Sequence, residues 1–467
     1  MTSTLQYCNL RKPFNQLFQK TSETKLLCRF TEMAPQPFLP KKSRLTKKAS
    51  KNFAKIQRGL ISTMPEMQIT LFLMNQSVQR RAVFFIGGYD PKTPDAFFKR
   101  LRKEIVRFDT LWSYQSTVST VDVTPDHEIG LATIETRAAR EDWSTTTDFN
   151  FLALDSIVLT DFARPLPVRL GKYLRAFADF VFSGTALHFF AKAWRFGLYF
   201  LYPFLAIVLF ALLGYAAARL TAHWLGALSW IIGLAVFSVA LTVLGKRWST
   251  NHLMDLWSFS LNFFRGRRPD AEALMQRFAE GIVGRVSAGK YDEVILIGHS
   301  TGGMLMLDVA ARCLAIDTAF SKRASKVAIL TLGSTALKAG YHPAATKFRE
   351  GVQRLTDDGT LEWVEIQCLT DAINFYKTDP VAEMKLKRAE SRNFPFVRRV
   401  RIRDMLQAET YKRIKRNLFR VHYQYVFGNT KPYWYDFFQV CCGPTFLSDR
   451  VNDHIVGGLS PEKVASE

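Results

Sequence analysis

The chain has 467 residues, 48% of them apolar and 22% charged, which suits two or three average domains with a sizeable core and excludes disorder throughout. Its net charge is +22, and two segments supply nearly all of it: residues 1–60 with a balance of +11, and residues 385–420 with +10. Because the rest of the chain is nearly neutral, the pattern argues against a nucleic-acid-binding protein.

The six cysteines form neither a CxxC pair nor a metal-ligand spacing. They are Cys8, Cys28, Cys313, Cys368, Cys441 and Cys442. Adjacent cysteines cannot readily bond to each other, so we expect reduced thiols in a reducing compartment. No HExxH, EF-hand or P-loop motif is present, and we expect neither a metal nor an organic cofactor.

Residues 1–66 are basic and poor in acids, and they lack the continuous apolar stretch of a secretory signal. They predict a disordered tail. Two alternatives stay open: an organelle transit peptide, and an upstream extension of a chain that really starts at Met64, Met67 or Met74.

The first part of the folded domain is predicted over residues 67–193. Ala82–Ile86 are five apolar residues typical of a buried strand; Gly87 and Gly88 follow, and then a helix with its basic positions on one side. Residues 112–138 contain alternating β-branched runs, broken at Pro125 and Asp126, and predict two further strands.

Two long uncharged runs come next. Phe196–Ala218 and Leu220–Gly245 hold 23 and 26 residues without a charge, and Arg219 separates them. Each run could cross the roughly 30 Å hydrocarbon layer as a helix. The preceding segment, 165–193, mixes apolar and basic residues at helical spacing, like an amphipathic approach to a membrane. We predict a two-helix transmembrane hairpin over 194–247; the alternative is a buried pair of core helices.

Basic residues flank this hairpin on both sides. Lys192 and Arg195 precede it, and Lys246 and Arg247 follow it, against the single Arg219 in the turn. The basic-flank rule places both ends in the cytoplasm. Two crossings return the chain to its starting side, so the part over 67–193 and the part over 248–467 can share one sheet.

The stretch "DEVILIGHSTGGMLMLDVA" places Ser300 between two glycines, after an apolar strand-like run and before an apolar helix-like run. A strand that turns directly into a helix leaves no room for a Cβ beside the turn residue, which Gly298 and Gly302 satisfy. The hydroxyl of Ser300 would then project beyond the sheet. We interpret it as a nucleophile.

Through "VILIGHSTGG" and the earlier "VFFIGGYDP" the chain resembles the α/β-hydrolase superfamily, over residues 80–190 and 250–440. The resemblance implies an α/β fold with a mostly parallel sheet flanked by helices. It also implies a catalytic triad in the chain order Ser, acid, His.

Because this order places the base after the serine and the acid in the chain, only two histidines remain as candidates for the base. His422 follows the strand-like "FVRRVRIR", where the family places its base, whereas His454 lies in the C-terminal segment, which we expect to be a loose tail. For the acid, Asp371 closely follows the strand-like "WVEIQC", as the family acid does. Asp379 precedes a proline and stays as the alternate.

The resemblance also implies an oxyanion hole made by two backbone N–H groups. One is expected from Thr301, directly after the nucleophile. The other is expected from Gly88 or Tyr89 in the loop "IGGYDP", which departs from the His-Gly-type loop common in this superfamily.

These features predict a membrane-anchored, esterase- or lipase-like serine hydrolase with its catalytic domain in the cytoplasm. The substrate would be a hydrophobic acyl ester or a lipid, and the basic segment over 385–420 could contact anionic headgroups. An acyltransferase or a thioesterase would use the same triad. A non-catalytic membrane scaffold could share the fold.

Overall fold

The structure is a computed structural model and describes residues 77–139, 141–390 and 392–458. The predictions for residues 1–66, and for Cys8 and Cys28, lie outside these ranges.

In the described part of the chain, nine strands form a single sheet in the order β2-β4-β5-β1-β6-β7-β8-β9, with β3 paired to β4. Their bounds are β1 Arg80–Ile86, β2 Tyr114–Val118, β3 Asp122–Val123, β4 Ile129–Ala138, β5 Ser144–Leu152, β6 Glu293–His299, β7 Lys326–Leu332, β8 Glu362–Cys368 and β9 Phe396–Val400. The run from β5 to β9 is parallel, and the pairs that involve β4 are antiparallel. The predicted α/β class with a mostly parallel sheet is confirmed.

The helices are α5 Pro94–Trp112, α6 Asp155–Phe162, α7 Leu166–Phe182, α8 Thr185–Leu225, α9 Ser229–Val239, α10 Gly245–Arg247, α11 Thr250–Phe264, α12 Pro269–Ala288, α13 Thr301–Ile316, α14 Leu337–Gly340, α15 Thr346–Asp357, α16 Pro380–Glu383, α17 Ala408–Ile414, α18 Leu418–His422, α19 Phe437–Cys442 and α20 Leu447–Asp453. Helices alternate with the strands from β6 to β9, whereas β2 to β5 follow one another directly and α6 to α12 all lie between β5 and β6. A 3₁₀ turn, Gly226–Leu228, joins α8 to α9, and a π-helical turn, Ala240–Leu244, joins α9 to α10.

Strand β1 lies at the centre of the sheet between β5 and β6. Ala82 to Ile86 are buried, as are all seven residues of β6, because helices cover both faces of the sheet. The strands on either side of residues 194–247 therefore share one sheet, as expected from the orientation argument. The sequence analysis missed β5, and the strand expected over "FVRRVRIR" ends at Val400.

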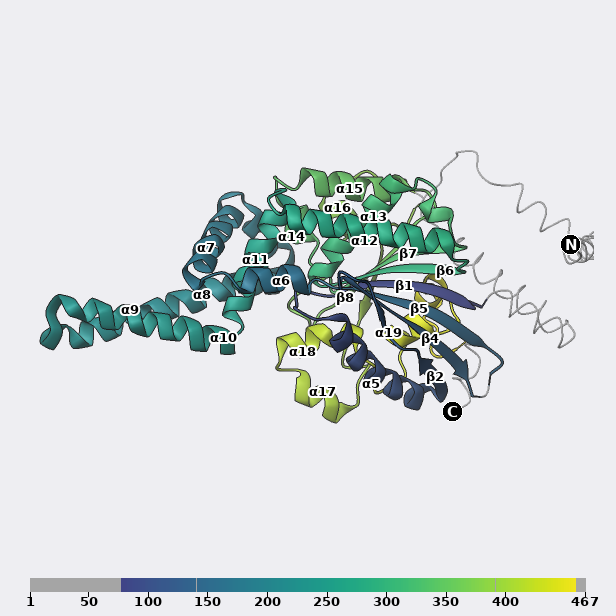
Figure 1. The fold of residues 1–467 in the computed structure, drawn as a ribbon, viewed down its shortest axis with the longest axis horizontal. Coiled ribbons are helices and arrows are strands. Elements are labelled where there is room, and N and C mark those ends of the chain that lie inside the picture. Colours follow the sequence, from purple (N-terminus) through teal and green to yellow (C-terminus); the bar gives the residue numbers. More distant parts are fainter. Residues whose placement is uncertain (1–76, 140, 391, 459–467) are drawn as a thin grey trace, which may run out of the picture. The chain divides into compact units, whose positions relative to one another are not determined.

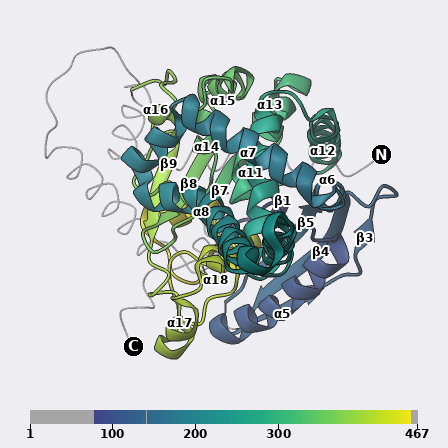
Figure 2. The same cartoon turned by 90° about the vertical axis from the view of Figure 1, so that its left-hand side faces the viewer.

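Helices cover the two faces of the sheet in separate layers (Figures 1 and 2). Helix α13 contacts β1, β6 and β7 and packs between α12 and α15, while α5 and α19 contact β4 and β5. Side chains of β1 alternate between the two cores: Phe84 belongs to the first, and Val83 and Phe85 to the second. The loop after β6 thus opens at the carboxyl edge of a rigid sheet.

One helical stretch in the described residues, Thr185–Arg247, is long and apolar enough to cross a membrane. It contains α8 to α10, which extend away from the sheet in Figure 1. A break at Ala193, with φ −147° and ψ 71°, divides α8. Helix α9 packs against α8, and a Cβ on Gly214 would lie 2.6 Å from the carbonyl oxygen of Gly233. Glycine at both positions permits this close approach.

A buried ion pair links the central strands to the C-terminal segment. Arg81 Nε lies 2.7 Å from Glu293 Oε2, and both side chains are fully buried. The guanidinium also donates to the carbonyl oxygens of Cys441, Gly443 and Thr445. Glu293 Oε1 accepts from the Leu447 N–H at 2.8 Å. The pair is therefore fully hydrogen-bonded.

Arg81→Met is expected to lower the free energy of unfolding by about 3–5 kcal/mol, because it leaves the buried Glu293 carboxylate without its counter-charge. Urea unfolding of the purified protein measures this loss. The matched control is Arg80→Met: the Arg80 side chain is 53% exposed, its nearest carboxylate oxygen lies 3.5 Å away on Asp148, and at most about 1 kcal/mol is expected. Equal losses in the two variants would contradict the role assigned to Arg81.

Candidate active site

Ser300 occupies the turn between β6 and α13 in a rare backbone conformation, with φ 59° and ψ −123°. A Cβ on Gly298 would collide with the carbonyl oxygen of Gly302, and a Cβ on Gly302 would collide with those of Ile86 and Gly87. The turn thus packs tightly against the end of β1, and this packing holds the backbone of Ser300 in its strained conformation. Its side chain is placed at the carboxyl edge of the sheet.

His422 and Asp371 form a buried pair at the same edge. His422 ends the short helix α18, and Asp371 follows β8 by three residues. His422 Nδ1 lies 2.8 Å from Asp371 Oδ2, and the two side chains are 3% and 0% exposed. The second carboxylate oxygen accepts from the Ile373 N–H at 2.8 Å, so the position of the carboxylate is fixed.

The other ring nitrogen of His422 is buried, and no side chain or backbone group of the described residues hydrogen-bonds to it. This includes Ser300, so the serine and the imidazole are not hydrogen-bonded here. Ser300 is 8% exposed. Catalytic hydrogen bonds of this kind are often long before a substrate binds.

His299 and Gly333 connect the serine to the histidine–aspartate pair. His299 Nε2 lies 3.0 Å from the carbonyl oxygen of His422, and the two rings are 4.6 Å apart. The Ser300 N–H donates to Leu332, and a Cβ on the next residue, Gly333, would lie 3.1 Å from Asp371 Oδ2. The three predicted triad residues therefore gather where β6, β7 and β8 end.

His299 is a buried, uncharged imidazole that lies between the Ser300 turn and His422. Burial lowers the pKa of His299 well below its usual range, and the neighbouring His422 lowers it further. Its ring nitrogen is occupied by the His422 carbonyl group. The imidazole of His299 therefore anchors the backbone of His422, which follows 123 residues later in the chain.

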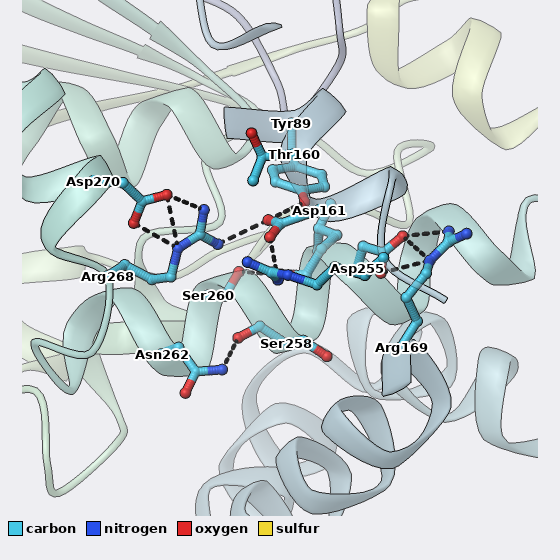
Figure 3. Close-up of polar contacts among 12 residues, drawn as sticks. Tyr89, Thr160, Asp161, Arg169, Asp255, Ser258, Ser260, Asn262, Arg268 and Asp270 are labelled. Atoms are coloured by element: carbon cyan, nitrogen blue, oxygen red, sulfur yellow. Dashed lines mark hydrogen bonds and ion pairs between the residues drawn. The ribbon is translucent and has the colours of Figure 1, made fainter. Parts of the chain in front are cut away.

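Gly88 lies against the serine. A Cβ on Gly88 would lie 3.6 Å from Ser300 Cβ and 3.8 Å from its Oγ. The side chain of Tyr89 is directed elsewhere, since its hydroxyl donates to Asp161 Oδ2 at 2.6 Å (Figure 3). A cavity of about 20 Å³, enough for one water molecule, lies beside Gly88 and His299.

The sequence analysis missed Lys338, on the short helix α14. Its Nζ donates to Thr301 Oγ1 at 3.0 Å, it is 1% exposed, and it lies 6.0 Å from the centre of the Trp257 ring. Burial lowers the pKa of Lys338 to about 7. A lone lysine in "STALKAGYHP" gives no sequence signal that its side chain turns inward.

Lys338→Met is expected to raise the stability of the protein by about 2–4 kcal/mol at neutral pH. The unfolded chain keeps the lysine proton up to about pH 10.4, whereas the folded protein releases it at about pH 7. The wild-type protein therefore loses stability as the pH falls from about 10.4 to about 7. The stability gained by the Lys338→Met variant over the wild type is expected to be largest near pH 7.

Thermal unfolding of the wild type and of Lys338→Met near pH 7 and above about pH 10.4 tests this prediction. A gain in stability that does not change with pH would contradict the assignment of a strained, buried ammonium group.

The alternates have other contacts. Asp379 caps α16 by accepting from the N–H groups of Val381 and Ala382, and it is paired with Arg388. His454 ends α20, with its ring 4.9 Å from that of Trp434. The expectation of a loose tail is wrong for α20, whose Val451 is fully buried. In the described residues, the hydrogen-bond and ion-pair partners of Asp379 and the ring partner of His454 include neither Ser300 nor His422.

Among the described residues, no three His, Cys, Asp or Glu side chains gather in a way that could hold a metal ion. Comparisons with protein-family models, with curated proteins and with solved structures found no match for this chain. The geometry of the site is therefore the basis for the function proposed below.

Proposed function

We propose that the protein is a serine hydrolase that cleaves acyl esters. The observation that carries the proposal is the buried His422–Asp371 pair, whose free imidazole nitrogen lies at the sheet edge that presents a strained Ser300. A carboxylate on Nδ1 fixes the tautomer of a histidine and leaves Nε2 to accept a proton. Several other buried polar atoms of the described residues also lack a partner, so the support comes from the position of this nitrogen, on an imidazole that is paired with Asp371 and lies at the edge of the sheet that carries Ser300.

In the proposed reaction, Ser300 Oγ attacks the acyl carbonyl carbon while His422 Nε2 takes the hydroxyl proton. The oxyanion is stabilised by the Thr301 N–H, at the start of α13, and by an N–H of Gly88 or Tyr89. His422 then protonates the leaving alcohol, and water hydrolyses the acyl-enzyme by the same steps in reverse order. The nearly buried serine requires side chains around it to move aside as the substrate enters.

Hydrolysis of p-nitrophenyl esters of increasing acyl length tests the proposal. We expect a burst of one p-nitrophenol per protein, followed by slower turnover, since acylation precedes deacylation. An acyltransferase or thioesterase would show the same burst, but would transfer the acyl group to an added alcohol or prefer acyl thioesters. Folded protein that shows neither burst nor turnover with any of these compounds would indicate a scaffold.

We propose further that α8 and the α9–α10 segment both cross a membrane, with the catalytic domain on the cytoplasmic side. Many large apolar side chains of this segment are exposed, including Leu212, Leu220, Ile231 and Leu234, each more than half exposed. The Gly214–Gly233 contact suits helices that associate in lipid, where small residues let backbones approach. The location also favours a hydrophobic ester or lipid as substrate.

A cysteine placed in the turn between α8 and α9 tests the two crossings. Ala227→Cys, in sealed membranes, should react with an impermeant maleimide only from the side opposite the catalytic domain. Ser287→Cys, on the exposed side of α12, is the control for the domain side. Labelling of both positions from the same side would contradict two crossings.

A further inference from the structure

A second cavity, of about 360 Å³, lies outside the candidate active site, among α6, α7, α11 and the start of α12. Its volume is in the range of small-molecule sites. Six basic side chains line it, namely Arg164, Arg169, Lys172, Arg175, Arg267 and Arg268. Three acids also line it, namely Asp161, Asp255 and Asp270. The lining thus carries an excess of three positive charges.

All three aspartates are held by arginines (Figure 3). Arg268 lies 2.8 Å from Asp161 and 2.6 Å from Asp270. Arg169 Nε lies 3.1 and 3.0 Å from the two carboxylate oxygens of Asp255. Asp161 also pairs with Arg164. These contacts form a rigid wall in which the charges of three acids and three arginines cancel.

The other three basic residues have no carboxylate partner among the described residues: Lys172, Arg175 and Arg267. Lys172 and Arg175 are on α7, and Arg267 is in the short loop between α11 and α12. All three side chains are exposed to solvent, and partial desolvation and the nearby Arg164 lower the pKa of Lys172. An anion in the cavity would relieve this crowding of like charges.

The cavity adjoins the apolar helices. Helices α7 and α11 pack against each other and against α8. Helix α7 also carries exposed apolar side chains: Leu174 is 39% exposed and Phe182 is 88% exposed. A helix with basic and exposed apolar residues together suits the boundary between lipid and water. Headgroup phosphates are the anions found at that boundary.

We propose that this cavity binds a phosphate group, carried by an anionic phospholipid headgroup or free in solution. Lys172, Arg175 and Arg267 would supply the charge-assisted hydrogen bonds, and the paired wall would fix the shape of the site. The site is separate from the Ser300 chemistry. Only the lipid source depends on the proposed membrane association.

The test uses the full chain in neutral detergent, in the Ser300→Ala background so that no probe is hydrolysed. Isothermal titration calorimetry measures binding of dihexanoyl phosphatidate, inorganic phosphate and dihexanoylglycerol. The variant replaces Lys172, Arg175 and Arg267 by Gln. The matched control replaces Lys412, Lys415 and Arg416 by Gln, which removes the same charge from exposed positions in the basic segment over 385–420.

We expect phosphatidate to bind, dihexanoylglycerol not to bind, and the cavity variant to bind phosphatidate at least about tenfold more weakly than the control variant. Phosphate that binds as tightly as phosphatidate would identify the free anion as the ligand, and weaker binding would identify the headgroup. The proposal is overturned if neither phosphate-bearing probe binds, or if the cavity variant binds them as well as the control variant does. Because binding is measured without turnover, that failure leaves the hydrolase proposal standing.

Discussion

Ser300→Ala is expected to lower ester turnover by about 10⁴- to 10⁶-fold, with folding unchanged. The substitution removes one oxygen atom and keeps the Cβ, so the backbone strain at φ 59° is the same in both proteins. Loss of the nucleophile of a triad usually leaves only the rate supplied by binding and by the oxyanion hole. Steady-state hydrolysis of the best p-nitrophenyl ester measures the loss, and thermal unfolding verifies the fold.

Ser334→Ala is the matched control. Ser334 is also buried near the elbow, where its Oγ accepts from the Ala336 N–H at 3.1 Å, but the proposed mechanism does not use it. We expect a loss of stability of about 1 kcal/mol and turnover within about tenfold of the wild type. Full turnover in Ser300→Ala would mean that the nucleophile is elsewhere.

Asp371→Asn is expected to lower turnover by about 10⁴-fold. The asparagine would keep the shape of the side chain, but an amide facing His422 Nδ1 no longer selects the tautomer that leaves Nε2 free to accept the serine proton. The effect should appear in kcat, because the carboxylate stabilises the imidazolium that forms during the reaction. Thermal unfolding shows whether the buried pair can be altered without loss of the fold.

Asp379→Asn discriminates between the two candidate acids. Loss of the Asp379 carboxylate would weaken the cap of α16 and the ion pair with Arg388, at a cost of about 1 kcal/mol of stability. Turnover is expected to be retained. The opposite result, with turnover abolished in Asp379→Asn and retained in Asp371→Asn, would reverse the assignment.

The sequence was most informative where short local rules operate. The turn at Ser300 could be predicted because strand, glycine, serine and helix follow one another within a few residues. Asp371 and His422 were predicted from chain order and a family resemblance, and the structure places them 2.8 Å apart. The central strand β1 could be predicted from its apolar run.

Features that depend on long-range packing could not be predicted. Lys338 looks like an ordinary surface residue until α14 turns it toward Thr301. Nothing in the sequence near His299 indicates that its ring bonds to the backbone of His422. Strand β5, rich in threonine, was missed because its polar residues become buried only when the sheet assembles.

The number of membrane crossings is another feature that the sequence does not determine. A long run without charge predicts helices, and the described part of the chain contains one apolar helical stretch long enough to cross a bilayer. Such a stretch can also pack against a domain, and Phe196 and Phe200 are buried against Trp257. The number of crossings therefore depends on which residues face lipid, which apolar length alone does not determine.

The most direct test of the proposed active site is covalent labelling with a fluorophosphonate, which reacts with an activated serine hydroxyl. We predict one adduct per folded protein, located by mass spectrometry on the Ser300 side chain, and no adduct in Ser300→Ala. Folded wild-type protein that stays unlabelled, or that carries the adduct on another residue, would contradict the proposed site.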